Sequence, residues 1–165
     1  MTVVIVIAIL GALSIQAYAF LIERAQRVNC TTNLKSLYTA ASAYTNDYKS
    51  WPQVSTTNVQ DPSYAQAWMA ALAPYQITAA NWICPSVQRL LKNPDYMQPE
   101  NIRLDYFATP FDANPVSPSK YPTQPWFVER GNMHGDGNLM IFASGQVKSL
   151  NEALQDSFTQ PQVAP

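Results

Sequence analysis

Few residues of this 165-residue chain could do chemistry. Cys30 and Cys84 are the two cysteines, and His134 is the single histidine. An oxidising compartment permits one pairing, and a Cys30–Cys84 disulfide would close a loop of about 53 residues and contribute about 2–4 kcal/mol. Two free buried thiols are the second interpretation. The third is a zinc site formed by Cys30, Cys84 and His134, but the C-x-x-C pair typical of structural zinc sites is missing.

His134 begins the segment HGDGN, residues 134–138. As the base of a hydrolase it would need a nucleophile and an acid, and the sequence contains no G-x-S-x-G elbow. A histidine hydrogen-bonded to the neighbouring loop or hairpin is the simpler interpretation. Asp136 and Asn138 offer oxygens at alternate positions, as in a calcium loop, but no bidentate glutamate follows and a Gly- and Asp-rich turn explains the same residues. We therefore expect no enzyme, no metal and no cofactor, with calcium near Asp136 and Asn138 as the alternative.

The element that must carry Cys30 is a long helix, predicted from Met1 to about Lys49. Residues 1–22 contain no ionisable side chain. At about 1.5 Å per residue they span roughly 33 Å, the thickness of the bilayer hydrocarbon. No glycine, proline or turn cluster follows them directly, and apolar residues continue at three- and four-residue spacing. These residues are Leu34, Leu37, Tyr38, Ala41, Ala43 and Tyr44.

Residues 1–22 have three interpretations. Ala17-Tyr18-Ala19 fits the cleavage site of a secretory signal, but no basic residue precedes the apolar run. An ordinary single-pass anchor is the second interpretation. The third is a helix that is stored in a membrane and later covered by copies of itself in a filament.

Residues 51–165 form the expected head, large enough for one compact domain. We predict a helix over residues 64–75 with Ser63 as its cap, a short helix or turn at 87–92, and a strand at 102–109. The proline-rich segment 110–125 is predicted to be an irregular loop. Residues 138–143 and 146–150 are predicted to pair as a hairpin across Ser144-Gly145, followed by a helix at 151–158 capped by Asn151 and a loose tail. The net charge of −1 and the scattered basic residues indicate no nucleic-acid surface.

Four separated segments resemble one family. VVIVIAILGALS followed by AYAFLIERAQ resembles the N-terminal helix of type IV pilins and type II secretion pseudopilins, including the aromatic Tyr18 and the basic Arg24-Ala25-Gln26. Residues 30–52 and the WICPS box at 82–86 are similar to segments of planctomycete and verrucomicrobial pseudopilin-like proteins. HGDGNLMIFASGQV resembles their C-terminal motif of His, nine residues and Asp-Gly, with His134 and Gly145 in place and Ser144 instead of the aspartate.

The family's mature chain begins with a G/(F or M)-T-L-x-E segment that a prepilin peptidase processes and N-methylates. This sequence starts inside that segment and has no acid before Glu23. The basic flank, Arg24 and Arg27, lies on the side expected to face outward, opposite to the positive-inside rule. We therefore expect a start upstream of Met1.

The resemblance implies an α+β, pilin-like fold, in which a long N-terminal helix packs on a small antiparallel sheet. Residues 1–22 would form the membrane segment and filament core, and 23–50 would pack on the head. The implied function is that of a structural subunit of a type IV pilus-like or type II secretion pseudopilus filament, held in the inner membrane and then assembled in the periplasm or outside the cell. The implied partners are copies of itself, other pilin-like subunits, an assembly motor platform and the prepilin peptidase.

The expected assembly residues are Val4, Ile7, Gly11, Ala12, Ile15 and Tyr18; the small ones, Gly11 and Ala12, permit close helix approach. The alternative is a membrane-tethered binding module that does not polymerise.

Overall fold

The computed structural model describes residues 2–55, 59, 61–96, 98, 101–111 and 118–159, without the side chains of residues 2, 4–17, 119 and 159. Its dominant element is the continuous helix α1, Thr2–Tyr48. The prediction of one long helix is confirmed. Lys49 ends it in a left-handed conformation with φ of 55°, and Pro52 follows, which cannot donate a helical hydrogen bond.

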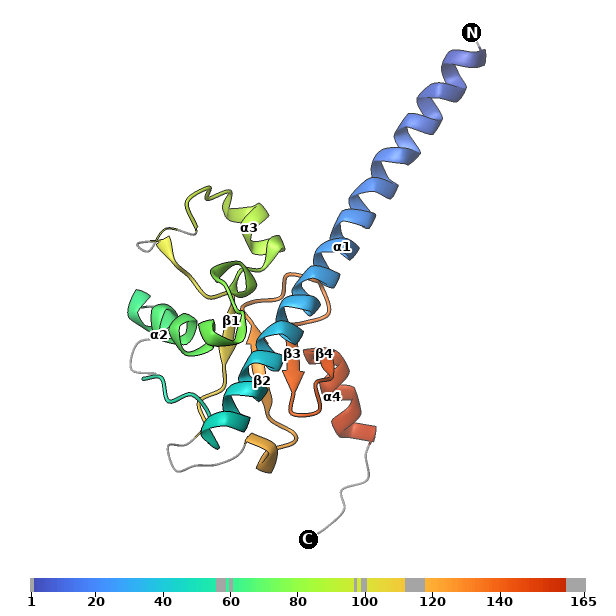
Figure 1. Ribbon diagram of the computed structural model, residues 1–165. Helices are drawn as coiled ribbons and strands as arrows, with labels where there is room; N and C mark the ends of the chain where they lie inside the picture. Colours follow the sequence, from blue (N-terminus) through green and yellow to red (C-terminus); the bar gives the residue numbers. More distant parts are fainter. Residues whose placement is uncertain are drawn as a thin grey trace.

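The C-terminal half of α1 packs against the head, whereas its N-terminal half projects away from the head (Figure 1). The buried positions recur every three or four residues, so one helix face enters the core. They are Cys30, Leu34, Leu37, Ala40 and Ala41. Helix α1 therefore has a projecting part and a part packed on the head.

The head contains a four-stranded antiparallel sheet in the order β1-β2-β3-β4. Its strands are β1 Tyr106–Ala108, β2 Pro125–Glu129, β3 Leu139–Phe142 and β4 Val147–Ser149. Each strand pairs with its neighbour in sequence, and α1 contacts β2, β3 and β4. This confirms an α+β fold with a long helix on an antiparallel sheet.

The hairpin of β3 and β4 is confirmed at the predicted place, but the other strands differ from the prediction. The strand expected at 102–109 is only three residues long, because the N–H of Asp105 donates to the carbonyl of Trp82 rather than to β2. Strand β2 was missed, since Pro125 was the last residue of the predicted proline-rich loop and residues 126–129 were assigned to no element. A register shift between Pro125 and Phe127 accompanies burial of the consecutive residues Trp126 and Phe127, so β2 does not show the simple alternation of a half-buried strand.

Helices α2 Pro62–Leu72, α3 Pro85–Leu91 and α4 Leu150–Thr159 complete the head, together with the 3₁₀ turns η1 Ala73–Tyr75, η2 Ala79–Trp82 and η4 Pro118–Lys120. The predicted caps were wrong by two residues. Asp61, not Ser63, caps α2, since its carboxylate accepts the N–H of Ser63 at 2.8 Å. At α4, Ser149 and Glu152 exchange bonds with each other's backbone N–H, so a capping box replaces the predicted Asn151 cap. The rest of the proline-rich loop, 112–117, and the tail, 160–165, lie outside the described residues.

Candidate functional site

The first candidate region is the part of α1 that leaves the head. Among the side chains that the structure describes there, five large apolar ones are between 58% and 69% exposed: Val3, Tyr18, Phe20, Leu21 and Val28. Of the predicted assembly residues, Tyr18 belongs to this surface. The backbone places Val4, Ile7, Gly11, Ala12 and Ile15 on the projecting helix, and their side chains lie outside the described ones.

Within the part of the chain that the structure describes, no helix is both long enough and apolar enough to cross a membrane.

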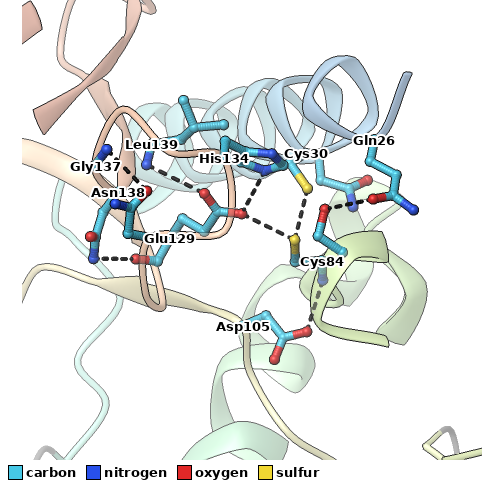
Figure 2. A network of polar contacts seen from close by, with 12 residues as sticks. Gln26, Cys30, Cys84, Asp105, Glu129, His134, Gly137, Asn138 and Leu139 are labelled. Atoms are coloured by element: carbon cyan, nitrogen blue, oxygen red, sulfur yellow. Dashed lines mark hydrogen bonds and ion pairs between the residues drawn. The ribbon is translucent and has the colours of Figure 1, made fainter. Parts of the chain in front are cut away.

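The second candidate region is a buried set of four side chains, here called the donor cluster: Cys30, Cys84, Glu129 and His134 (Figure 2). Sulfur Sγ of Cys84 lies 2.8 Å from Sγ of Cys30 and 3.0 Å from Oε1 of Glu129. The same carboxylate oxygen lies 3.2 Å from Nε2 of His134. All four donor atoms lie within 4.8 Å of one another.

Each member of the donor cluster comes from a different element. Cys30 lies on the buried face of α1. Cys84 is the N-cap of α3, where Pro85 occupies the first turn because its missing N–H is not needed there. Glu129 ends β2, and His134 lies in the loop between β2 and β3. Residues separated by up to 104 positions therefore meet only through the tertiary fold.

Backbone contacts hold Cys84 in place. Its N–H donates to Oδ2 of Asp105 at 2.8 Å. Asp105 is itself buried and paired with Arg103, at 3.0 Å between Nε and Oδ1. From the other side, the amide of Asn33 on α1 donates to the carbonyl of Ile83 at 3.0 Å. The WICPS box is thus fixed between β1 and α1.

The loop that carries His134 is equally constrained. Gly137 has φ of +90°, and a Cβ added there would lie 2.7 Å from Cβ of Leu150, so only glycine fits. Its N–H donates to Oδ1 of Asn132 at 3.0 Å. The side-chain amide of Asn138 donates to the carbonyl of Glu129, also at 3.0 Å, and closes the loop onto the end of β2.

Burial dominates the electrostatics of the donor cluster. The side chain of Glu129 is fully buried and that of His134 is 4% exposed. Burial, and then the contact with Cys84, raises the pKa of Glu129 to about 7, although His134 and the N–H of Leu139 oppose the shift. The hydrogen bond with Cys30 and burial raise the pKa of the Cys84 thiol well above its ordinary value. Both groups therefore favour their protonated forms when nothing else neutralises them.

The cysteine prediction concerned a pair, and the structure brings Cys30 and Cys84 together as free thiols. Their sulfurs are farther apart than the roughly 2.05 Å of a disulfide bond. Neither the disulfide nor the zinc interpretation included Glu129. The sequence signal for Glu129 was its position directly after the apolar residues Trp126, Phe127 and Val128. It was missed because β2 itself was missed.

The C-terminal segment that resembles the pseudopilin-like motif divides into two parts in space. His134 belongs to the donor cluster, whereas Ser144 and Gly145 form the turn between β3 and β4. Gly145 has φ of +75°, and an added Cβ would lie 3.2 Å from the ring of Tyr38 on α1. Oγ of Ser144 accepts the N–H of Gln146 at 3.3 Å, the bond that an aspartate side chain makes in such a turn, so the replacement keeps the turn contact.

The residues of the calcium alternative have other partners. Oδ2 of Asp136 forms an ion pair with Nη1 of Arg27 at 2.5 Å. The amide nitrogen of Asn138 is directed at Glu129, as described above. The two side chains therefore make separate contacts with the protein.

Comparison of the chain with protein-family models, curated proteins and solved structures finds no match.

Proposed function

We propose that this protein is a structural subunit of a pilin-like filament, assembled through the projecting part of α1. The observation that supports the proposal most is the exposed apolar surface of Tyr18, Phe20, Leu21 and Val28 on a helix that continues well beyond the head. Apolar surface of this kind is stabilised when it is removed from water, at about 25 cal/mol per Å². A helix surface that the described part of the head leaves uncovered needs a bilayer or a neighbouring helix.

The head supports the same proposal because it holds α1 as a rigid extension. The buried face of α1 runs from Cys30 to Ala41 and contacts α3, η2 and three strands. The projecting and packed parts form one unbroken helix, so a load on the projecting part would pass directly into the head. This is what a filament subunit requires, and the membrane, the motor platform and the prepilin peptidase remain the partners that the sequence resemblance implies.

A non-catalytic role agrees with the chemistry of the donor cluster. A cysteine nucleophile needs a lowered pKa and access to solvent. Cys84 has a raised pKa and is fully buried. We propose that the four side chains stabilise the head.

The test compares one substitution at two exposed leucines in the full chain. Leu21→Asp changes the projecting part of α1, where the leucine is 61% exposed, and Leu90→Asp changes α3, where it is 68% exposed. Cells producing each variant are sheared, and the sheared material is separated by mass and imaged by electron microscopy. We expect filaments from the unchanged chain and from Leu90→Asp, and a loss of filaments with Leu21→Asp.

Two results would contradict the proposal. Filaments that persist with Leu21→Asp would show that assembly does not use this surface. A chain that is monomeric after detergent extraction, and absent from the sheared fraction in all three forms, would instead support the tethered binding module.

A further inference from the structure

We propose that Cys30, Cys84, Glu129 and His134 bind a single zinc ion, which fastens α1 to the head. The inference goes beyond the proposed function and does not depend on it. It rests on the chemistry of the four side chains, their proximity, their burial and their origin in four separate elements.

The donor set suits zinc. Two thiolates, one imidazole nitrogen and one carboxylate oxygen are ligands that Zn²⁺ accepts, and four ligands complete its tetrahedral shell in structural sites. With bonds of about 2.0–2.3 Å, ligand atoms around such an ion lie about 3.3–3.8 Å apart. The donor atoms here lie between 2.8 Å and 4.8 Å apart, so small side-chain shifts would surround the ion.

Charge favours an ion at this position. Among the described residues, the ion pair of Glu129 is with His134, and no lysine or arginine reaches the carboxylate. A buried carboxylate beside two thiols is costly unless a cation compensates it. When zinc binds, the two thiols, and Glu129 where it is protonated, release their protons to solvent as their sulfur and oxygen atoms bond to the metal, and His134 binds as the neutral imidazole.

The surroundings of the donor cluster resemble those of a prepared site. The N–H of Leu139 donates to Oε2 of Glu129 at 3.4 Å, which leaves Oε1 directed at Cys84 and His134 (Figure 2). Contacts of this kind orient a ligand before the metal arrives. Met133, His134 and Gly135 also line an open groove beside α1, so the groove borders the donor cluster at His134.

A disulfide explains only half of the donor cluster. It would use Cys30 and Cys84 and would remove the thiol proton that Cys84 donates to Glu129. Glu129 and His134 would then stay buried with each other as their only charged partners among the described ion pairs. Zinc accounts for all four side chains together, and it is the more complete explanation.

The first experiment uses the full chain, purified in detergent with a thiol reductant and then exposed to Zn²⁺ or Co²⁺. We expect one zinc ion per chain by elemental mass spectrometry. With Co²⁺ we expect the near-ultraviolet thiolate-to-metal charge-transfer band and the visible bands of a tetrahedral ion. Release of zinc by a thiol-specific mercurial would show that the cysteines hold it.

Conservative variants then test the assigned ligands. Loss of an outer-shell partner of a metal ligand costs about 10- to 100-fold in metal affinity, so Glu129→Gln and His134→Asn, which remove assigned ligands, should each lower zinc affinity by at least this factor. Competition with a chromophoric chelator measures the change. Asp136→Asn is the matched control, because Asp136 is a carboxylate of the same loop that lies outside the donor cluster and pairs with Arg27. The zinc affinity of the Asp136→Asn variant should equal that of the unchanged chain.

Three outcomes would overturn the proposal. The first is a chain that binds no zinc under reducing conditions. The second is a protein isolated from cells whose intact mass is two hydrogens lower than that of the reduced chain and whose cysteines do not react with a thiol reagent. These results would indicate a Cys30–Cys84 disulfide. The third is a Glu129→Gln or His134→Asn variant that keeps the circular dichroism spectrum and the full zinc affinity. Filament assembly is scored separately, so either proposal can fail without the other.

Discussion

Helix α1 meets the head in two chemically different regions. Towards its C-terminal end it packs on an aromatic cluster, defined as Trp51, Trp68, Trp82, Trp126 and Phe127. Trp51 lies 5.0 Å from Trp126 and 5.7 Å from Phe127 between ring centroids, and Tyr38 of α1 lies 4.8 Å from Trp126. About two helical turns before Tyr38, Cys30 meets the polar donor cluster.

The two regions hold the helix by different physics. The aromatic cluster gains from the removal of large apolar surfaces from water, which needs no bound ion. The donor cluster consists of groups that cost free energy when buried alone, so its contribution depends on what neutralises them. The aromatic cluster therefore attaches α1 to the head without a further partner, which we call the unconditional attachment. The donor cluster attaches α1 only when a metal binds or the two cysteines are oxidised, which we call the conditional attachment.

The largest effect is expected in the aromatic cluster. Phe127 is fully buried and lies within 6.2 Å of Trp51, Trp68 and Trp82 between ring centroids. Phe127→Ala should lower the free energy of unfolding by about 3–5 kcal/mol, through lost transfer energy and the cavity left behind. Urea unfolding of the full chain in detergent, followed by tryptophan fluorescence, measures this loss.

The matched control is Phe158→Ala on α4, where the ring is 85% exposed. The same chemical change there should leave the free energy of unfolding nearly unchanged. Equal losses at the two positions would show that the aromatic cluster does not carry the attachment.

The second effect tests the conditional attachment. We consider zinc bound to the donor cluster at a free zinc concentration of about 100 times its dissociation constant. Removal of this zinc by a chelator should lower the free energy of unfolding by about 2.7 kcal/mol. The same urea titration, with and without chelator under reducing conditions, measures the difference. In the His134→Asn variant, whose zinc affinity should be at least about 10-fold lower, the effect of the chelator should fall to about half or less. A loss as large in that variant as in the unchanged chain would assign the chelator's effect to another site.

The sequence predicted the long helix and the β3–β4 hairpin better than the donor cluster. The long helix and the β3–β4 hairpin were predictable because a single local signal determines each: apolar spacing in α1, and Ser144-Gly145 between two apolar runs. Strand β2 was missed since Pro125 and the preceding prolines favour a loop, and a bulge near Trp126 removes the alternation that would identify a strand. The caps of α2 and α4 were misplaced by only two residues.

The donor cluster could be predicted only in part. Cys30, Cys84 and His134 stood out because their residue types are rare in this chain. Glu129 did not, because one glutamate among eleven acidic residues carries no local mark of burial. Its place follows from the pairing of β2 with β3 and from the turn of the next loop, which are properties of the fold rather than of any short segment.

The third effect is expected at Tyr38, where α1 packs on the aromatic cluster. Its ring contacts Trp126, and its hydroxyl donates to the carbonyl of Ala143 at 2.8 Å. Tyr38→Phe keeps the ring and removes the hydrogen bond, so the free energy of unfolding should fall by about 1 kcal/mol. Tyr48→Phe, at a ring 63% exposed, is the control and should change little. No difference between the two variants would show that the hydrogen bond to Ala143 adds nothing to the attachment of the β3–β4 hairpin to α1.

The smallest effect is expected at the surface of the donor region. Arg27 on α1 and Asp136 in the loop of His134 form an ion pair whose side chains are 35% and 55% exposed. Exposed pairs contribute little because water and salt screen them. Asp136→Asn should therefore change the free energy of unfolding by no more than about 0.5 kcal/mol, with the difference shrinking further at high salt. A loss above 1 kcal/mol at any salt concentration would mean that this pair holds the loop in place. The polar contacts that attach α1 to the head would then include this exposed ion pair as well as the buried donor cluster. The donor region and the aromatic cluster would in that case differ in their position along α1 and not in whether they depend on an ion.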